Sequence, residues 1–338
     1  MPNKRQGSGR KRASGTTSAK RDKDVIAALT RAERAGQDAT ITFTGRKTLH
    51  VSSLDKVFFD DAGITKGDVM RYYASVSPLL LPVLKDRPLI LKRYPNGIGG
   101  PSFFQQNAGT HPASVRAAEV ETEDGERATR IIGGDLPTLL YTVQLGTIAV
   151  HPWQSRLPTV EEADYSTIDL DPGEGVPFTR IVELALRIRE ELDALDLQAA
   201  LKTSGSRGLH IVLPLPRRTT YARSAALAER IAASVTAKNP RLATLERSLR
   251  SRPAGTIYVD AKQNARGKSV ASAYSVRERA GAPVSAPLSW SELDGKLRIG
   301  DFTIQTMPRR LEAVGDLWGE AMKQRNKSRA IDRALAAG

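Results

Sequence analysis

The chain of 338 residues contains no cysteine and only four histidines. The absence of cysteine excludes disulfide frameworks, zinc clusters built on thiolates, and thiol nucleophiles. The scarcity of histidine also disfavours histidine-rich metal sites. Any metal bound by this protein is therefore expected to be a hard cation held by carboxylate oxygens.

Long apolar segments are also missing. No run approaches the roughly 20 apolar residues needed to cross a bilayer. The N-terminus, MPNKRQGSGRKR, is basic and lacks the apolar stretch of a secretory signal. Hydrophobic residues nevertheless make up 40% of the sequence, enough for a globular core. We therefore expect a cytoplasmic protein with no membrane partner.

Acidic residues are in deficit, because 37 aspartates and glutamates face 51 lysines and arginines, a net charge of +14. Residues 1–24 hold eight basic and two acidic residues and so supply +6 of this charge. Such a tail alone is equally consistent with a solubilising arm. Since the rest of the chain is basic as well, the charge favours a nucleic-acid partner.

Composition divides the chain into a disordered basic tail at residues 1–24, one domain at residues 25–325 and a basic C-terminal tail at residues 326–338. Within the domain, strands and helices alternate without a regular βαβ rhythm, which predicts an α+β fold with mixed or antiparallel sheets flanked by helices. The expected strands include residues 88–93, 147–150, 165–170, 201–204, 209–213 and 256–259, and the expected helices include residues 137–144, 181–192 and 223–237.

Three aspartates follow apolar strands. Asp169 and Asp171 end the segment 165–170, and Asp260 ends the segment 256–259. In a strand, residues i and i+2 point to the same face, so Asp169 and Asp171 would project together. A divalent cation relieves the repulsion between such carboxylates, and two metals of this kind serve phosphoryl transfer. The alternative is a solvated turn, although such aspartates seldom follow directly on a buried strand.

Residues 202–210, KTSGSRGLH, combine two glycines with hydroxyl groups and cations. Such a turn can hold a triphosphate through backbone N–H groups and positive side chains. It lacks the Walker A pattern, and an ordinary charged β-turn is the alternative. The candidate nucleotide ligands here are Lys202, Ser204 and His210.

Two further segments carry candidate ligands. Gln263 follows Asp260, and Arg277 and Arg279 are expected on one side of a strand, where both could meet a phosphate. Phe103 and Phe104 are adjacent in a loop, and at least one could stack on a base. A solvated basic strand, or one core and one surface phenylalanine, are the structural alternatives.

Several short segments occur in order between residues 43 and 320. They are LDKV at 54–57, TKGD at 65–68, LKRYPNG at 91–97, the Phe103-Phe104 pair, HPW at 151–153, DLDPGEG at 169–175, KTSG at 202–205, Asp260 with Gln263 and Asn264, and YSVR at 274–277. In this joint order they resemble the polymerase (primase-polymerase) domain of bacterial DNA ligase D, a member of the archaeo-eukaryotic primase superfamily used in non-homologous end joining.

The resemblance implies a primase-like catalytic core and a metal-dependent nucleotidyltransferase that fills gaps and extends 3′ ends with nucleotides or ribonucleotides. It implies two divalent ions, manganese or magnesium, held by Asp169, Asp171 and Asp260, with catalysis there. It also implies further roles by position: nucleotide binding for His151, Lys202, Ser204, His210, Gln263, Arg277 and Arg279, binding of a DNA 5′-phosphate for Ser53, Lys56 and Lys66, and template stacking for Phe103 and Phe104.

Ser53 departs from the family, which often has asparagine there, so recognition of the DNA end is expected to be weaker. No K-x-D-G ligase motif is present, which suggests a polymerase that stands alone or was cut from a larger protein. The implied partners are gapped DNA or DNA ends, NTPs and dNTPs, a Ku-like protein and a separate DNA ligase, acting at the nucleoid. A metal-dependent nuclease, a non-catalytic DNA-binding module and a dedicated primase remain as alternatives.

Overall fold

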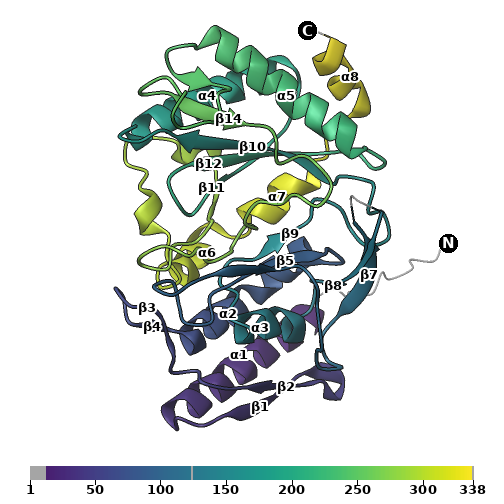
Figure 1. Cartoon of the computed structure of the whole chain (residues 1–338), viewed down its shortest axis with the longest axis vertical. Helices are drawn as coiled ribbons and strands as arrows, with labels where there is room; N and C mark the ends of the chain where they lie inside the picture. The colour runs from purple at the N-terminus through teal and green to yellow at the C-terminus, as the bar shows by residue number, and fades with distance from the viewer. Residues whose placement is uncertain (1–12, 123–124, 337–338) are drawn as a thin grey trace, which may run out of the picture.

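A six-stranded sheet forms the centre of one half of the protein, in a computed structural model that describes residues 13–122 and 125–336 (Figure 1). Neighbouring strands are antiparallel, apart from the parallel pair β13 and β14. The order across the sheet is β13 (Ala243–Thr244), β14 (Ile257–Asp260), β10 (Tyr165–Pro172), β12 (Leu209–Pro214), β11 (Ala200–Thr203) and β15 (Pro287–Leu288).

Two helices, α4 (Phe178–Ala194) and α5 (Tyr221–Lys238), cover one face of this sheet (Figure 1). In β10, Ile168 and Leu170 point to that face and are fully buried, so the intervening odd-numbered residues point to the other face. This alternation leaves Asp169 and Asp171 on the face that the helices do not cover.

The other half holds three helices, α1 (Ala13–Arg34), α2 (Lys66–Leu84) and α3 (Leu136–Gln144). A capping box formed by Thr65 and Asp68 begins α2, with the Asp68 N–H donating to Thr65 Oγ1 at 3.0 Å. Small antiparallel sheets surround these helices: β1 (Ala39–Thr42) with β2 (Thr48–Val51), β3 (Val57–Phe59) with β4 (Ile64–Thr65), β6 (Phe103–Gln105) with β5 (Leu89–Arg93) and β9 (His151–Pro152), and β7 (Ala117–Glu121) with β8 (Arg127–Ile131).

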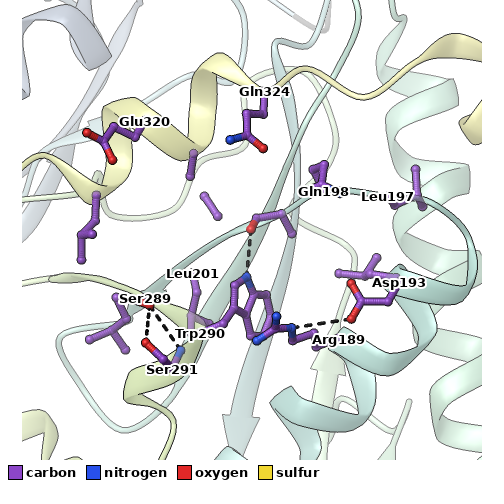
Figure 2. Close-up of a pocket in the computed structure, with 16 residues that line it drawn as sticks. Arg189, Asp193, Leu197, Gln198, Leu201, Ser289, Trp290, Ser291, Glu320 and Gln324 are labelled. Carbon is purple, nitrogen blue, oxygen red and sulfur yellow. Dashed lines mark hydrogen bonds and ion pairs between the residues drawn. The ribbon is translucent and has the colours of Figure 1, made fainter.

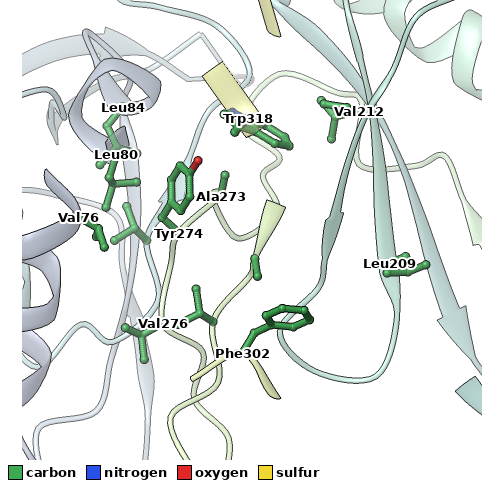
Figure 3. Close-up of a cluster of buried hydrophobic side chains, with 14 of the residues drawn as sticks. Val76, Leu80, Leu84, Leu209, Val212, Ala273, Tyr274, Val276, Phe302 and Trp318 are labelled. Atoms are coloured by element: carbon green, nitrogen blue, oxygen red, sulfur yellow. The ribbon is translucent and has the colours of Figure 1, made fainter. Parts of the chain in front are cut away.

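A shared core joins the two halves. Figure 3 shows α2 side chains on one side of the segment 273–276, and Trp318 with β12 on its other side. Tyr274 is fully buried, and its carbonyl accepts a hydrogen bond from the Tyr72 hydroxyl at 2.9 Å. The remaining elements are η1 (Thr44–Arg46), η2 (Trp290–Glu292), η3 (Ile299–Asp301), α6 (Met307–Val314), α7 (Leu317–Lys323) and α8 (Ser328–Ala336).

The α+β fold, with antiparallel and mixed sheets flanked by helices, is confirmed. Two boundaries were wrong. The predicted tail at residues 1–24 is helical from Ala13, because α1 is nucleated by packing against α2 and each added residue then gains a hydrogen bond. Residues 1–12 lie outside the described residues. The predicted tail at residues 326–338 contains α8, whose Ile331 and two alanines are buried against α5 while its charges face outward.

Two predicted strands are also absent among the described residues. Residues 147–150 make only one bridge, at Thr147, and the paired strand begins at His151. The segment carrying Arg277 and Arg279 makes a single bridge at Val276, because the chain turns directly afterwards: the Arg279 N–H bonds to the Arg277 carbonyl, and the Ala282 N–H bonds to the Arg279 carbonyl. No helix within the described ranges has the length and apolar character that a bilayer crossing requires.

Candidate active site

One row of polar residues crosses four strands of the main sheet on its uncovered face. Asp169 in β10 is paired in register with Asp260 in β14 on one side and with His210 in β12 on the other. His210 is in turn paired with Lys202 in β11. Since cross-strand partners have Cβ atoms about 4.5–5.5 Å apart, the register alone places these four side chains side by side.

The charge of Asp169 is stabilised by this row. His210 Nε2 lies 3.3 Å from Asp169 Oδ1, and Lys202 Nζ lies 2.6 Å from His210 Nδ1. Burial alone would raise the pKa of Asp169, but the hydrogen bond from His210 and the charges of Lys202 and Arg277 lower it. Asp169 is therefore ionised at neutral pH.

The pKa values of the two basic groups of the row are lowered as well, which favours their neutral forms. Burial, and then the charge of Lys202, lowers the pKa of His210 to about 4, so its ring is neutral at neutral pH. Burial likewise lowers the pKa of Lys202. Lys202 is 1% exposed and also donates to Ser285 Oγ at 2.7 Å. It therefore lies behind His210 and does not face the cavity described below.

Asp260 is buried and held by three donors. Its carboxylate accepts from the Lys262 N–H at 2.7 Å, the Gln263 side chain at 2.9 Å and the Tyr258 hydroxyl at 3.2 Å. The loop after Asp260 is fixed by Asn264, whose side chain bonds both the N–H and the carbonyl of Thr167 on β10. The hydrogen bond to Asp260 thus holds the Gln263 side chain at the site.

Asp171 is bound by an arginine that the sequence analysis missed. Arg252 donates to the Asp171 carbonyl at 3.1 Å and lies 3.3 Å from its carboxylate, while Arg207 lies at 3.9 Å. The Arg252 side chain is only 3% exposed and stacks on Tyr258, with 5.2 Å from Cζ to the ring centroid. Arg252 lies in a turn-rich segment without periodicity, so no local pattern marked it.

Asp169, Asp171 and His210 open onto a cavity of about 280 Å³. Asp260, Lys202 and Arg252 do not line it. Eight of the predicted site residues line it: His151, Asp169, Asp171, Ser204, His210, Gln263, Arg277 and Arg279. The lining also includes Ser206, Arg207, Gly208 and residues 269–271, which the prediction did not include. The cavity thus combines carboxylates on one wall with hydroxyls, amides and cations on the others.

The turn at residues 204–208 is shaped by backbone contacts. The Ser204 hydroxyl accepts from the N–H groups of Ser206 and Gly208, both at 3.1 Å. A Cβ at Gly208 would overlap the carbonyl oxygen of Leu170 in β10, so only glycine lets the turn pass this close to the carboxylate strand. Gly208 therefore allows the turn to pack directly against β10, the strand that carries Asp169 and Asp171.

The cationic wall consists of Arg277 beside His151. Burial, and then the charge of Arg277, lowers the pKa of His151 to about 4. Arg277 Nη1 donates to the Ser204 carbonyl, and its Nε lies 3.3 Å from Glu278. An anion entering the cavity would therefore meet a fixed guanidinium.

The positions of the three aspartates determine whether they could hold a metal ion together. Among the described residues, no three or more histidine, aspartate or glutamate side chains are gathered as a metal centre. Each aspartate instead binds a donor of the protein itself. The donor set still fits a hard divalent cation, because Asp169 and Asp260 are register partners and Asp171 shares the face of Asp169.

The predicted 5′-phosphate residues form a separate group on the other half. Lys66, at the start of α2, is 5% exposed, and burial together with the nearby charge of Lys56 lowers its pKa to about 8. Lys56 Nζ donates to Asn96 at 2.8 Å, and Ser53 is in a left-handed turn (φ 49°). The first N–H groups of α2 already bond to Lys56, Leu54 and Thr65, so only side chains remain for an anion.

The two phenylalanines are both exposed, Phe103 by 48% and Phe104 by 65%. They lie in the short strand β6, paired with Arg93 and Lys92 of β5. Arg93 lies over the Phe103 ring at 5.1 Å and Lys92 over the Phe104 ring at 5.8 Å. Neither ring joins the core, so the alternative with one core phenylalanine was wrong.

A larger pocket, of about 440 Å³, lies between α4, β11, η2 and α7 (Figure 2). Several of its polar groups make hydrogen bonds or ion pairs within the protein. Trp290 donates to the Ala199 carbonyl at 3.1 Å, and Arg189 lies 3.6 Å from Asp193. This pocket contains none of the predicted site residues, so size alone does not identify the active site.

Comparison with known proteins identifies the family to which this chain is similar. The sequence pattern of the family described as LigD, primase-polymerase domain, matches residues 65–318. The multifunctional non-homologous end joining protein LigD of Pseudomonas aeruginosa is 33% identical over 279 residues, which are 81% of this chain and 33% of that protein. The bifunctional LigD of Bacillus subtilis is 33% identical over 269 residues, 79% of this chain and 43% of that protein.

A solved structure is similar over most of the chain. The polymerase domain of Mycobacterium tuberculosis ligase D, in complex with DNA, has a TM-score of 0.76 and 31% identity. The similarity covers 82% of this chain and 99% of that domain. The chain spans about a third to two fifths of the length of the curated relatives named above.

Proposed function

Because this chain belongs to the LigD primase-polymerase domain family, we propose that it fills gaps and extends the 3′ ends of broken DNA during non-homologous end joining. It is a nucleotidyltransferase of the primase-polymerase type. We propose that it takes ribonucleoside or deoxyribonucleoside triphosphates and that its DNA substrate is a gap or an end with a downstream 5′-phosphate.

The observation that carries this proposal is the pairing of Asp169 with Asp260, at a cavity that Asp169 lines together with hydroxyls and cations. Two carboxylates on one sheet face, next to a turn with hydroxyls and cations, suit transfer of a nucleotide to a hydroxyl. A binding module would have no use for this carboxylate row. The alternative of a non-catalytic DNA-binding module is therefore less well supported.

We propose that Asp169, Asp171 and Asp260 hold two divalent ions, manganese or magnesium. When bound, such ions lower the pKa of the attacking hydroxyl and neutralise the charge that develops on the phosphates. The donors that now bind Asp171 and Asp260 would then share these carboxylates with the ions. His210 keeps Asp169 ionised and fixes the direction of its carboxylate.

The rest of the cavity orients the nucleotide. Arg277 and Arg279 would bind its phosphates, and Ser204, His151 and Gln263 would contact the sugar and phosphates. Lys202 does not line the cavity and would orient His210 through the hydrogen bond between the two side chains. In-line attack then needs only the primer 3′-hydroxyl and the α-phosphate to be held close together.

DNA would be bound by the two separate groups. Lys56 and Lys66, with Ser53, would bind the downstream 5′-phosphate, and Phe103 and Phe104 would stack on the template strand. We propose a Ku-like protein and a separate DNA ligase as partners, since the relatives are named as non-homologous end joining proteins. With DNA as its substrate, the enzyme would act in the cytoplasm at the nucleoid.

The test is extension of a labelled primer on gapped DNA that carries a downstream 5′-phosphate, with manganese and either ATP or dATP. The proposal expects growth that depends on the metal and increases with the 5′-phosphate. Shortening of the DNA without nucleotides would identify a nuclease. Intact DNA binding without growth would identify a binding module, and synthesis without a primer would identify a primase.

A further inference from the structure

A carboxylate that no sequence motif marked lies beside the cationic wall of the cavity. The Glu278 side chain is 13% exposed and lies between two cations from different parts of the chain. Its Oε2 is 3.3 Å from Arg277 Nε, and its Oε1 is 3.8 Å from Lys92 Nζ in β5. An ionised group this buried is stable only when paired, and both partners are present.

Arg277 is held at two points. Its Nη1 donates to the Ser204 carbonyl, and its Nε lies against Glu278. Within the described part of the chain no hydrogen bond uses Nη2, and Arg277 lines the cavity. Because the guanidinium is planar, fixing Nε and Nη1 also fixes the direction in which Nη2 points.

The second contact of Glu278 anchors it from outside the nucleotide cavity. Lys92 lies over the rings of Tyr94 and Phe104, at 5.1 and 5.8 Å from their centroids. Its side chain is 29% exposed, so the ring faces and Glu278 restrict it. Glu278 therefore connects Arg277 to the exposed sheet that carries Phe104.

We propose that Glu278 is a positioning residue that holds the Arg277 guanidinium in the direction needed to bind the phosphates of the incoming nucleotide. This inference rests on the proposed function, since it assumes that the cavity takes a nucleoside triphosphate. Glu278 does not line the cavity and is not expected to touch the nucleotide itself.

Charge alone makes the opposite prediction, which allows a sharp test. A carboxylate near a triphosphate repels it, so removing that charge would tighten nucleotide binding if Glu278 acted only through its field. If Glu278 acts by fixing Arg277, its removal frees the guanidinium and weakens binding. Glu278→Gln therefore separates the two effects by the sign of the change.

The experiment is calorimetric titration of ATP with manganese into the protein bound to gapped DNA whose primer ends in a dideoxynucleotide, so that no chemistry occurs. Glu278→Gln is expected to raise the Kd about tenfold, the effect of losing one hydrogen bond to a charged group. Glu278→Asp keeps the charge and withdraws the carboxylate by one methylene, so it is also expected to weaken binding.

A double-mutant cycle tests whether Glu278 affects nucleotide binding through Arg277. In an Arg277→Gln background, Glu278→Gln is expected to cause no further loss, because the group that it positions is gone. Glu292→Gln is the matched control, since Glu292 pairs with Arg310 at 2.7 Å away from the cavity. Its Kd for ATP should equal that of the wild type, and thermal unfolding of each variant checks its folding.

Unchanged or tighter binding by Glu278→Gln would overturn the inference, as would an equal loss in the Arg277→Gln background. Wild-type protein that binds ATP with this dependence but fails to extend a primer would refute the proposed polymerase function and leave the role of Glu278 standing. Wild-type protein that binds no ATP on gapped DNA would overturn both.

Discussion

Asp169 and Asp260 are direct register partners on the adjacent antiparallel strands β10 and β14, although 90 residues of chain separate them. Strand pairing therefore brings two carboxylates face to face on the uncovered side of the sheet. Their environments differ, because Asp169 faces His210 whereas Asp260 is held by Lys262 and Gln263. The proposed metal site is built on this pair of carboxylates.

Replacing Asp169 by asparagine should abolish nucleotide addition while DNA binding remains. The change removes one proposed metal ligand, and we expect a loss on the order of a thousandfold or more in primer extension. Manganese should also no longer raise the melting temperature as it does for the wild type. Asp196→Asn, at an exposed surface ion pair with Arg333, is the control. Wild-type extension by Asp169→Asn would remove this residue from the site.

Recognition of a 5′-phosphate should weaken as the pH rises. The pKa of Lys66 is lowered to about 8, so this side chain is positive below pH 8 and loses its charge above it. The phosphate is doubly ionised throughout that range, since its second pKa is about 6. The Kd for gapped DNA with a 5′-phosphate should therefore rise between pH 7 and pH 9, and the Kd without the phosphate should stay flat.

Two variants isolate Lys66 in that titration. Lys66→Arg keeps its charge at pH 9, so the preference for the 5′-phosphate should persist there. Lys66→Gln should lack the preference at every pH. A pH dependence that survives in Lys66→Gln would show that another group is responsible.

Phe104→Ala should weaken binding of a single-stranded template without destabilising the fold. The ring is 65% exposed, so little core packing is lost, whereas one stacked base contributes about 1–3 kcal/mol. Fluorescence anisotropy with template overhangs measures the binding, and thermal unfolding measures the stability. Val314→Ala, which is 40% exposed on α6, is the control and should change neither. Equal affinity for overhangs in Phe104→Ala and wild type would argue against stacking on this ring.

Gly208→Ala should destabilise the protein by about 2–4 kcal/mol. The added methyl group would overlap the Leu170 carbonyl oxygen and force β10 and β12 apart next to Asp169. Urea unfolding gives the free energy. Gly300→Ala, where a Cβ meets no atom within 4 Å, should cost far less. Similar stabilities for the two variants would mean that the turn moves away freely.

Local patterns were sufficient for much of the fold. Side-chain alternation predicts the strand that carries Asp169, and helical spacing of apolar residues predicts α4. Local hydrogen bonding explains the capping box at Thr65. Each of these signals acts within a few residues. The same patterns failed at α8, where basic residues on one face concealed the buried Ile331 on the other. Average composition hides an apolar stripe when the charged face is the larger one.

The sequence by itself determined the family, the three aspartates and most of the residues that line the cavity, because the matching segments keep their order along the chain. Only the tertiary structure decided that Asp169 faces Asp260, that Arg252 binds Asp171 and that Glu278 lies between Arg277 and Lys92. These contacts depend on strand register and on packing between distant segments. Neither is encoded in a local pattern, since each requires the whole core to form first.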